Sequence, residues 1–259
     1  MAREALGLIL LVSATENRRI RLFVEYFTHQ HGKRMFYLSA ICARFHFAQN
    51  LKREIVMFFT PQPVVVAIDL DDTIAHLNGP FATWHNERFG TAVRYEDIIS
   101  FNLIEVYEIV FPTLVQRLNT FRREHWRLML PVEEGLATLL YWKEMAQLHV
   151  VTARCESLAD YSAALIDHFY PGVITEIHHT NGFATLYPER QKSKFAVCQK
   201  IGACMMIDDS LSTALEFAGS DIPYLLPNHP WNQGAVPQGA VRIHGGLVEA
   251  VDWFVANID

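Results

Sequence analysis

Two short apolar segments of this chain run directly into clustered carboxylates, and this feature constrains the fold more than any other. The first is VVVAIDLDDT, residues 64–73, and the second is CMMIDDS, residues 204–210. Continuous apolar runs with β-branched residues are typical of strands that are buried on both faces of a sheet. Carboxylates this close together repel one another and resist losing water. We therefore expect a cation where these strands end.

The rest of the chain after residue 130 alternates between strand-like and helix-like stretches. Apolar, β-branched stretches indicate further strands. Pro131 is expected to open a helix, because proline is tolerated at the first helical position. The expected strands are 148–152, 173–180, 222–227 and 241–245, and the expected helices are 131–145, 156–170, 193–203, 210–219 and 246–258. This alternation predicts an α/β fold with a parallel sheet, whose ligands bind at the carboxyl ends of the strands.

The domain organisation follows from where this alternation begins and is interrupted. At 259 residues, the chain has the length of one large domain or of one domain with an insert. We expect an N-terminal extension of unknown role over 1–60, a core domain formed by 61–75 and 131–259, and an aromatic-rich helical insert over 76–130.

The N-terminal extension is basic and aromatic, and its pattern is not clean. Phe23, Tyr26 and Phe27 are compatible with one helical face, so an extra helical layer, a partner-binding segment and a mobile extension all stay open. Residues 6–12 resemble the apolar part of a short signal peptide. The run is short, however, and Arg3 is balanced by Glu4, which favours a buried strand or helix edge.

Net charge, hydropathy and cysteine spacing argue against several classes of protein. The net charge of −6 argues against charge-driven binding of a nucleic acid polymer, although a nucleotide stays open. No apolar run reaches the length of roughly 18 residues that a membrane span needs. The four cysteines lack paired spacing, so we expect reduced thiols and a cytoplasmic protein; they are Cys42, Cys155, Cys198 and Cys204. The oligomeric state cannot be inferred.

The residue types at the strand ends favour phosphate chemistry. Hard oxygen ligands with few imidazoles favour Mg²⁺, which commonly takes a substrate phosphate as a further ligand. The hydroxyl of Thr152 and the ammonium of Lys194 are suited to hold that phosphate. One carboxylate could attack phosphorus, while another, two residues on, protonates the leaving oxygen and activates water. For DLDDT alone, a helix cap is the competing interpretation.

The ordered set DLDDT at 69–73, VVTAR at 150–154, Lys194 before a helix, and MMIDDS at 205–210 resembles the four motifs of the haloacid dehalogenase (HAD) superfamily. The resemblance covers about residues 64–245. KSKFAVCQKIGACMMIDDS and LPNHPWNQ further resemble the 5′(3′)-deoxyribonucleotidase-like branch. The resemblance implies a HAD-type Rossmann-like parallel sheet, with a helical C1 cap inserted after the first strand.

The resemblance also implies catalytic and metal-binding roles. Asp69 would be the phosphoaspartyl nucleophile and a Mg²⁺ ligand. Asp71 would be the general acid/base, with its backbone carbonyl on the metal. Asp208 would be the third protein ligand, and Asp209 would orient it or a metal-bound water.

The phosphoryl group would be held by three further residues. Thr152 and the Ala153 amide would bind it, and Lys194 would neutralise charge, with Lys192 as a competitor for that role. Aspartate at both 69 and 71 argues for phosphoryl transfer, because the dehalogenase members lack the second acid.

Several other side chains are weaker candidates for the site. Trp84 could stack on a flat group of the substrate, although packing inside the cap is the simpler interpretation. Arg154 could contact substrate or form an ion pair at a helix start. Trp231 and Asn232 could lie near the rim, although a packed loop is the simpler interpretation. His178 and His179 are adjacent on a strand, so they should point to opposite faces.

These observations predict a Mg²⁺-dependent phosphatase that hydrolyses a small phosphomonoester, with a nucleoside monophosphate as the leading substrate. One alternative is an enzyme acting on prenyl phosphates or diphosphates, which an apolar cap pocket would favour. Asp71-Asp72 also resembles the diphosphate-binding motif of prenyl enzymes, but residue 75 is Ala where that motif has its third acid. The other alternative is a protein that binds a phosphate ligand without turnover.

Overall fold

The computed structural model describes residues 8–14, 20–26, 34–40, 63–182 and 190–258. The chain divides into two compact units, residues 1–62 and residues 63–259. Of the four cysteines, Cys155, Cys198 and Cys204 are free, and Cys42 lies outside the described residues. Within the described part of the chain, no helix is both long and apolar enough to cross a membrane.

The N-terminal unit contains a small antiparallel sheet in the order β1-β2-β3. Its strands are β1 (Leu8–Ala14), β2 (Ile20–Tyr26) and β3 (Arg34–Ala40). A helical face through Phe23 and Tyr26 is therefore wrong, because both residues lie in β2, while Phe27 falls outside the described residues. The sequence IRLFVEY has the β-branched and aromatic composition of a strand, and β1 agrees with the strand interpretation of the first apolar run.

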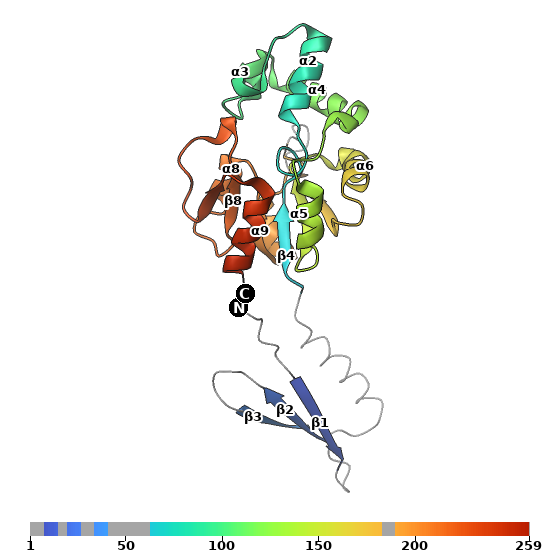
Figure 1. Ribbon diagram of the computed structural model, residues 1–259, viewed down its shortest axis with the longest axis vertical. Helices are drawn as coiled ribbons and strands as arrows, with labels where there is room; N and C mark the ends of the chain where they lie inside the picture. Colours follow the sequence, from blue (N-terminus) through green and yellow to red (C-terminus); the bar gives the residue numbers. More distant parts are fainter. Residues whose placement is uncertain (1–7, 15–19, 27–33, 41–62, 183–189, 259) are drawn as a thin grey trace. The chain divides into compact units, whose positions relative to one another are not determined.

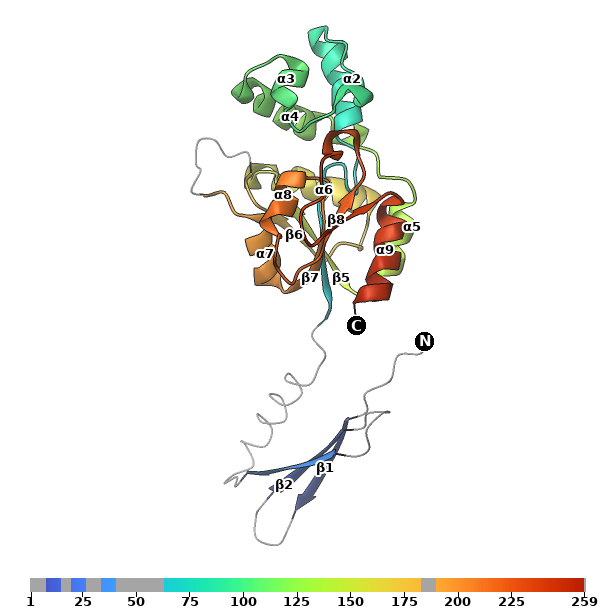
Figure 2. The ribbon, with the colours of Figure 1, turned by 90° about the vertical axis from the view of Figure 1, so that its left-hand side faces the viewer.

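The second unit is built on a six-stranded parallel sheet in the order β6-β5-β4-β7-β8-β9 (Figures 1 and 2). The strands are β4 (Val65–Ile68), β5 (Gln147–Thr152), β6 (Glu176–His179), β7 (Ala203–Ile207), β8 (Tyr224–Pro227) and β9 (Ala240–Ile243). β4 pairs with β5 on one side and β7 on the other. The expected α/β parallel sheet is confirmed, and the two carboxylate-bearing strands are neighbours.

Helices cover both faces of this sheet. They are α5 (Gly135–Trp142), α6 (Ala159–Phe169), α7 (Lys194–Ile201), α8 (Leu211–Glu216) and α9 (Gly246–Asn257), with short 3-10 turns η3 (Glu156–Leu158) and η5 (Pro230–Asn232). Successive β4 side chains point to opposite faces. Val66 and Ile68 join the core under α5, α6 and α9, whereas Val65 and Ala67 join the core under α7 and α8.

A helical insert between β4 and β5, here called the cap, stands at the carboxyl edge of the sheet (Figure 1). It comprises α2 (Asn78–Phe89), η1 (Tyr95–Asp97), α3 (Leu103–Tyr107), α4 (Phe111–Glu124) and η2 (Trp126–Leu128). The expectation that Pro131 opens a helix is wrong. Pro131 instead forms a bridge with Ala75, and α5 begins four residues later, at Gly135.

Candidate active site

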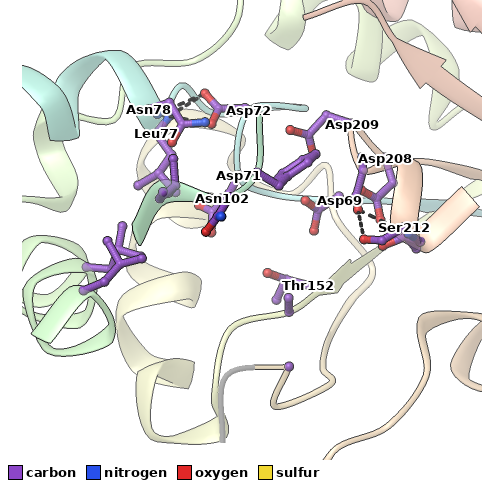
Figure 3. Close-up of a pocket in the computed structure, with 18 of the residues that line it drawn as sticks. Asp69, Asp71, Asp72, Leu77, Asn78, Asn102, Thr152, Asp208, Asp209 and Ser212 are labelled. Carbon is purple, nitrogen blue, oxygen red and sulfur yellow. Dashed lines mark hydrogen bonds between the residues drawn. The ribbon is translucent and has the colours of Figure 1, made fainter. Parts of the chain in front are cut away.

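Three neighbouring strands bring the predicted residues to one place. Asp69 directly follows β4, Asp208 and Asp209 directly follow β7, and Thr152 is the last residue of β5. The Asp69 backbone N–H donates to the Ile207 carbonyl at 2.8 Å, which extends the β4–β7 pairing to the first carboxylate. All four residues line one cavity of about 430 Å³ between the sheet edge and the cap (Figure 3).

Lys194 lies between the two strand-end carboxylates. Its ammonium is 2.8 Å from Asp69 Oδ1 and 2.7 Å from Asp208 Oδ2, and its side chain is buried. Ser193 fixes this position, because its hydroxyl accepts from the Ala196 N–H and caps α7, whose first residue is Lys194. Lys192, the alternative lysine, is exposed and lies 3.5 Å from Glu156. The geometry therefore places Lys194, and not Lys192, in the cavity.

The carboxylates near Lys194 carry more negative charge than one ammonium can balance. Burial raises the pKa of Asp69 to about 7, with the charges of Asp208 and Asp71 acting in the same direction and Lys194 opposing them. Burial also raises the pKa of Asp209 well above its ordinary value. Oxygen atoms of Asp69, Asp208 and Asp209 lie within 4.8 Å of one another. This arrangement favours a bound cation.

Asp209 is positioned by residues of the loop after β8. Trp231 Nε1 donates to the Asp209 carboxylate at 2.8 Å, and the Asn232 side-chain amide donates to the Asp209 backbone carbonyl at 2.8 Å. Trp231 and Asn232 are both buried. They therefore hold Asp209 in place from a packed loop outside the cavity, which agrees with the packed-loop interpretation and not with a location at the rim.

Asp71 is held by two arginines. Arg154 donates from Nε to Oδ2 at 3.0 Å and from Nη2 to Oδ1 at 2.6 Å, while Arg122 Nη2 donates to Oδ2 at 2.8 Å. Burial alone would raise the pKa of Asp71, but the charges of Arg122 and Arg154 outweigh it and lower the pKa to about 2. Arg122 belongs to α4, so this cluster joins the cap to the core.

Asp72 has a structural role near the start of α2, although it is buried and is not itself the N-cap residue, which is Leu77. Its carboxylate accepts from the Leu77 N–H at 2.9 Å and the Asn78 N–H at 3.1 Å, at the start of α2. Its φ of 56° is in the left-handed region, where Asp is better tolerated than most residues. Burial raises the pKa of this carboxyl to about 7.

The remaining predicted residues divide into those at the cavity and those away from it. Thr152 and Ala153 line the cavity, as does Gly182, which the sequence did not single out. A Cβ on Gly182 would lie 3.1 Å from the Ala153 Cβ, so a glycine suits this close approach. Arg154 is fully buried against Asp71. Trp84 does not line the cavity; it is half-buried and packs within the cap against Phe81, Phe89, Phe121 and His125.

The adjacent histidines His178 and His179 point to opposite faces, as their strand spacing predicted. His178 Nε2 lies 2.9 Å from His149 Nδ1, and His179 Nε2 lies 3.2 Å from the Ser162 hydroxyl. His149 and His178, with Glu176, form a group of possible ligands on β5 and β6 that is separate from the carboxylate cluster.

Comparison with known proteins identifies the fold. No family model matches the chain, and no curated protein matches it. Among solved structures, a haloacid dehalogenase-like family hydrolase from Streptococcus pneumoniae has 14% sequence identity and a TM-score of 0.53, covering 74% of this chain and 98% of its own. A HAD-superfamily hydrolase of subfamily IA from Geobacter sulfurreducens PCA has 16% identity and a TM-score of 0.50, covering 74% and 96%.

Proposed function

We propose that this chain, which has the fold of HAD-superfamily hydrolases, is a Mg²⁺-dependent phosphatase that hydrolyses a small phosphomonoester through an aspartyl-phosphate. The contact of one buried ammonium with two strand-end carboxylates carries this proposal. Lys194 lies 2.8 Å from Asp69 and 2.7 Å from Asp208, beside Thr152 in the same cavity. A nucleophilic carboxylate, a fixed positive charge and a hydroxyl donor are thus combined at one sheet edge.

The donor set fits Mg²⁺. Asp69, Asp208 and Asp209 offer buried carboxylate oxygens within 4.8 Å of one another, and Mg²⁺ prefers such oxygen ligands. We expect Asp69, the backbone carbonyl of Asp71 and Asp208 to hold the ion directly, and Asp209 to orient Asp208 or a metal-bound water. The ion would supply positive charge to the phosphoryl oxygens. Lys194 alone leaves much of the charge of these carboxylates unbalanced.

The chain's own residues then account for the chemistry. An Asp69 carboxylate oxygen attacks phosphorus, the bond from phosphorus to the leaving oxygen breaks, and Asp71 protonates that oxygen. Water, deprotonated by Asp71, next attacks the aspartyl-phosphate and releases inorganic phosphate. Thr152 and the Ala153 amide bind the phosphoryl oxygens through both steps, and Lys194 offsets their negative charge.

Asp71 needs to change partners to perform this role. Both of its carboxylate oxygens are occupied by guanidinium N–H groups of Arg122 and Arg154. With both arginines in place, the lowered pKa of Asp71 keeps its carboxylate ionised. To take up a proton and then transfer it to the leaving oxygen, the side chain must first turn away from at least one arginine. Because Arg122 comes from the cap, movement of the cap relative to the core would provide that change.

The proposal is tested by phosphate release from a panel of nucleotides, sugar phosphates and alkyl phosphates, with Mg²⁺ and with EDTA. We expect release that requires Mg²⁺ and that Asp69→Asn abolishes without loss of the fold. A matched control is Asp160→Asn, on an exposed turn of α6 away from the cavity. A folded protein that binds phosphate but releases none from any ester would instead support the binding role.

A nucleoside monophosphate and a prenyl phosphate place different demands on the cap. A nucleotide needs polar partners for its base and sugar, and Trp84, the proposed stacking residue, is packed within the cap. Apolar cap residues line much of the cavity. This observation favours the second candidate, a phosphatase acting on an ester with an apolar leaving group.

A further inference from the structure

The cap forms the wall of the cavity opposite the carboxylates. Figure 3 shows Leu77 and Asn102 across the cavity from Asp69 and Asp208. Ten residues between 77 and 122 line the cavity, and seven of these have apolar side chains. The seven are Leu77, Phe101, Leu103, Ile104, Phe111, Leu114 and Leu118, and the other three are Asn78, Asn102 and Arg122.

The charges around the cavity do not favour a second anionic group on the substrate. Among the described lining residues, the cations are Arg122 and Lys194, and each is already paired with carboxylates. Arg122 lies 2.8 Å from Asp71 and Lys194 lies 2.8 Å from Asp69. A diphosphate or a phosphorylated acid would therefore bring a second negative charge that has to compete with Asp71 for Arg122, the cation of the cap among the described lining residues.

Polar leaving groups are disfavoured by the same wall. Sugar hydroxyls or base amides placed against Leu103, Ile104 and Leu114 would lose water without gaining partners, which costs free energy for each unpaired group. Hydrocarbon groups placed there would instead be removed from water, which is favourable in proportion to the buried area. The wall thus discriminates between leaving groups by their polarity.

We propose that this apolar wall of the cap binds the leaving group, so that the substrates are monophosphate esters of uncharged aliphatic or aromatic alcohols. This inference rests on the proposed phosphatase function. Within that function, it identifies the class of ester that is hydrolysed. It also assigns substrate specificity to α3 and α4 rather than to Trp84.

The test is a series of straight-chain alkyl phosphates from ethyl to octyl, with the full chain and Mg²⁺. We expect kcat/KM to rise about fourfold for each added methylene until the wall is covered, as the transfer free energy of a methylene predicts. Cytidine and thymidine 5′-monophosphates should react more slowly than the octyl ester. A rate independent of chain length, or a preference for either nucleotide, overturns the inference.

Matched substitutions test the wall itself. Phe111→Ser should lower kcat/KM for the octyl ester about tenfold or more and affect the ethyl ester much less, because a longer chain buries more apolar area against the wall. Val110→Ser is the control, since Val110 is the preceding residue, is 66% exposed and does not line the cavity. Equal effects of the two variants on the octyl ester contradict the inference.

Binding separates failure of this inference from failure of the proposed function. Alkylphosphonates, which cannot be hydrolysed, are titrated calorimetrically into wild type with Mg²⁺. Affinity that grows with chain length supports the apolar wall, even if no ester is hydrolysed. Absence of hydrolysis together with such affinity would contradict only the proposed phosphatase function. If simple esters are hydrolysed but the affinity for alkylphosphonates does not depend on chain length, the phosphatase function is supported and the role of the apolar wall is contradicted.

Discussion

The guanidinium of Arg154 holds both carboxylate oxygens of Asp71, with Nε 3.0 Å from Oδ2 and Nη2 2.6 Å from Oδ1. Arg154 is fully buried, and the Asp71 side chain is only 14% exposed. Such a bidentate pair fixes the carboxylate in one orientation. The residue proposed to transfer protons is thus held in an ion pair within the core, and Arg122 of α4 joins that pair from the cap.

Removing Arg154 should lower the stability of the fold substantially, because the mostly buried carboxylate of Asp71 would lose one of its two arginine partners. We expect Arg154→Gln to lower the free energy of unfolding by about 3 kcal/mol, toward the lower end for a broken buried pair, since Arg122 still contacts Asp71. Urea unfolding measures this change. Arg94→Gln is the control, because Arg94 pairs with Asp97 on the surface, where loss of an ion pair changes the free energy of unfolding little. Equal losses would contradict the account.

The two lysines of KSK provide a second comparison. Lys194→Met should reduce turnover about a hundredfold or more, since it removes the charge beside Asp69 and Asp208. Lys192→Met should leave turnover near the wild-type value, because Lys192 is exposed beside Glu156. Phosphate release is the measurement, with circular dichroism to confirm folding. A larger loss in Lys192→Met would reverse the assignment.

Much of the fold was predictable because the signals are local. Buried parallel strands give continuous apolar runs, and both carboxylate-bearing strands were recognised this way. Glycine at the end of a helix is similarly informative: Gly202 has a φ of 66° and ends α7, one residue before the end of the expected helix. β2 of the N-terminal sheet was missed because Phe23 and Tyr26 lie three residues apart, a spacing that also fits a helix.

The site was only partly predictable, since side-chain partners depend on contacts distant in sequence. Asp69, Thr152, Lys194 and Asp208 could be inferred from strand ends and motif order. Arg122 could not, because it lies 51 residues from Asp71 and reaches it only through the position of α4. Trp84 was open to two interpretations, and the packing of the cap decided between them.

Magnesium should stabilise the fold by binding to the native carboxylates. At a Mg²⁺ concentration of 100 times Kd, the gain is about 2.7 kcal/mol, and EDTA should remove it. Asp208→Asn should abolish most of this gain, whereas Asp252→Asn, on an exposed position of α9, should not. Thermal unfolding with and without Mg²⁺ measures it. An undiminished gain in Asp208→Asn would exclude Asp208 as a ligand.

Acid should weaken the fold through His85 in the cap. Burial and the charge of Arg117 lower the pKa of His85 to about 4, whereas an unfolded histidine has a pKa of about 6.5. The unfolded state therefore binds more protons between these values, so this contribution is present above pH 6.5 and is lost as the pH falls toward 4.

The measurement for His85 is urea unfolding of wild type and His85→Gln at pH 7 and pH 5. The stability advantage of wild type over the variant should shrink at pH 5. Because other titrating groups are common to both proteins, the difference isolates His85. An advantage that is constant or grows at pH 5 would contradict the lowered pKa.

The most direct test of the central claim is to locate the phosphoryl group during turnover. Wild type is mixed with an ester that it hydrolyses, quenched in acid within a single turnover, digested and analysed by mass spectrometry. We predict a phosphoryl adduct on Asp69, in the peptide that contains VVVAIDLDDT, and no adduct in Asp69→Asn. An adduct on another residue, or turnover by Asp69→Asn at a rate near that of wild type, would contradict the account.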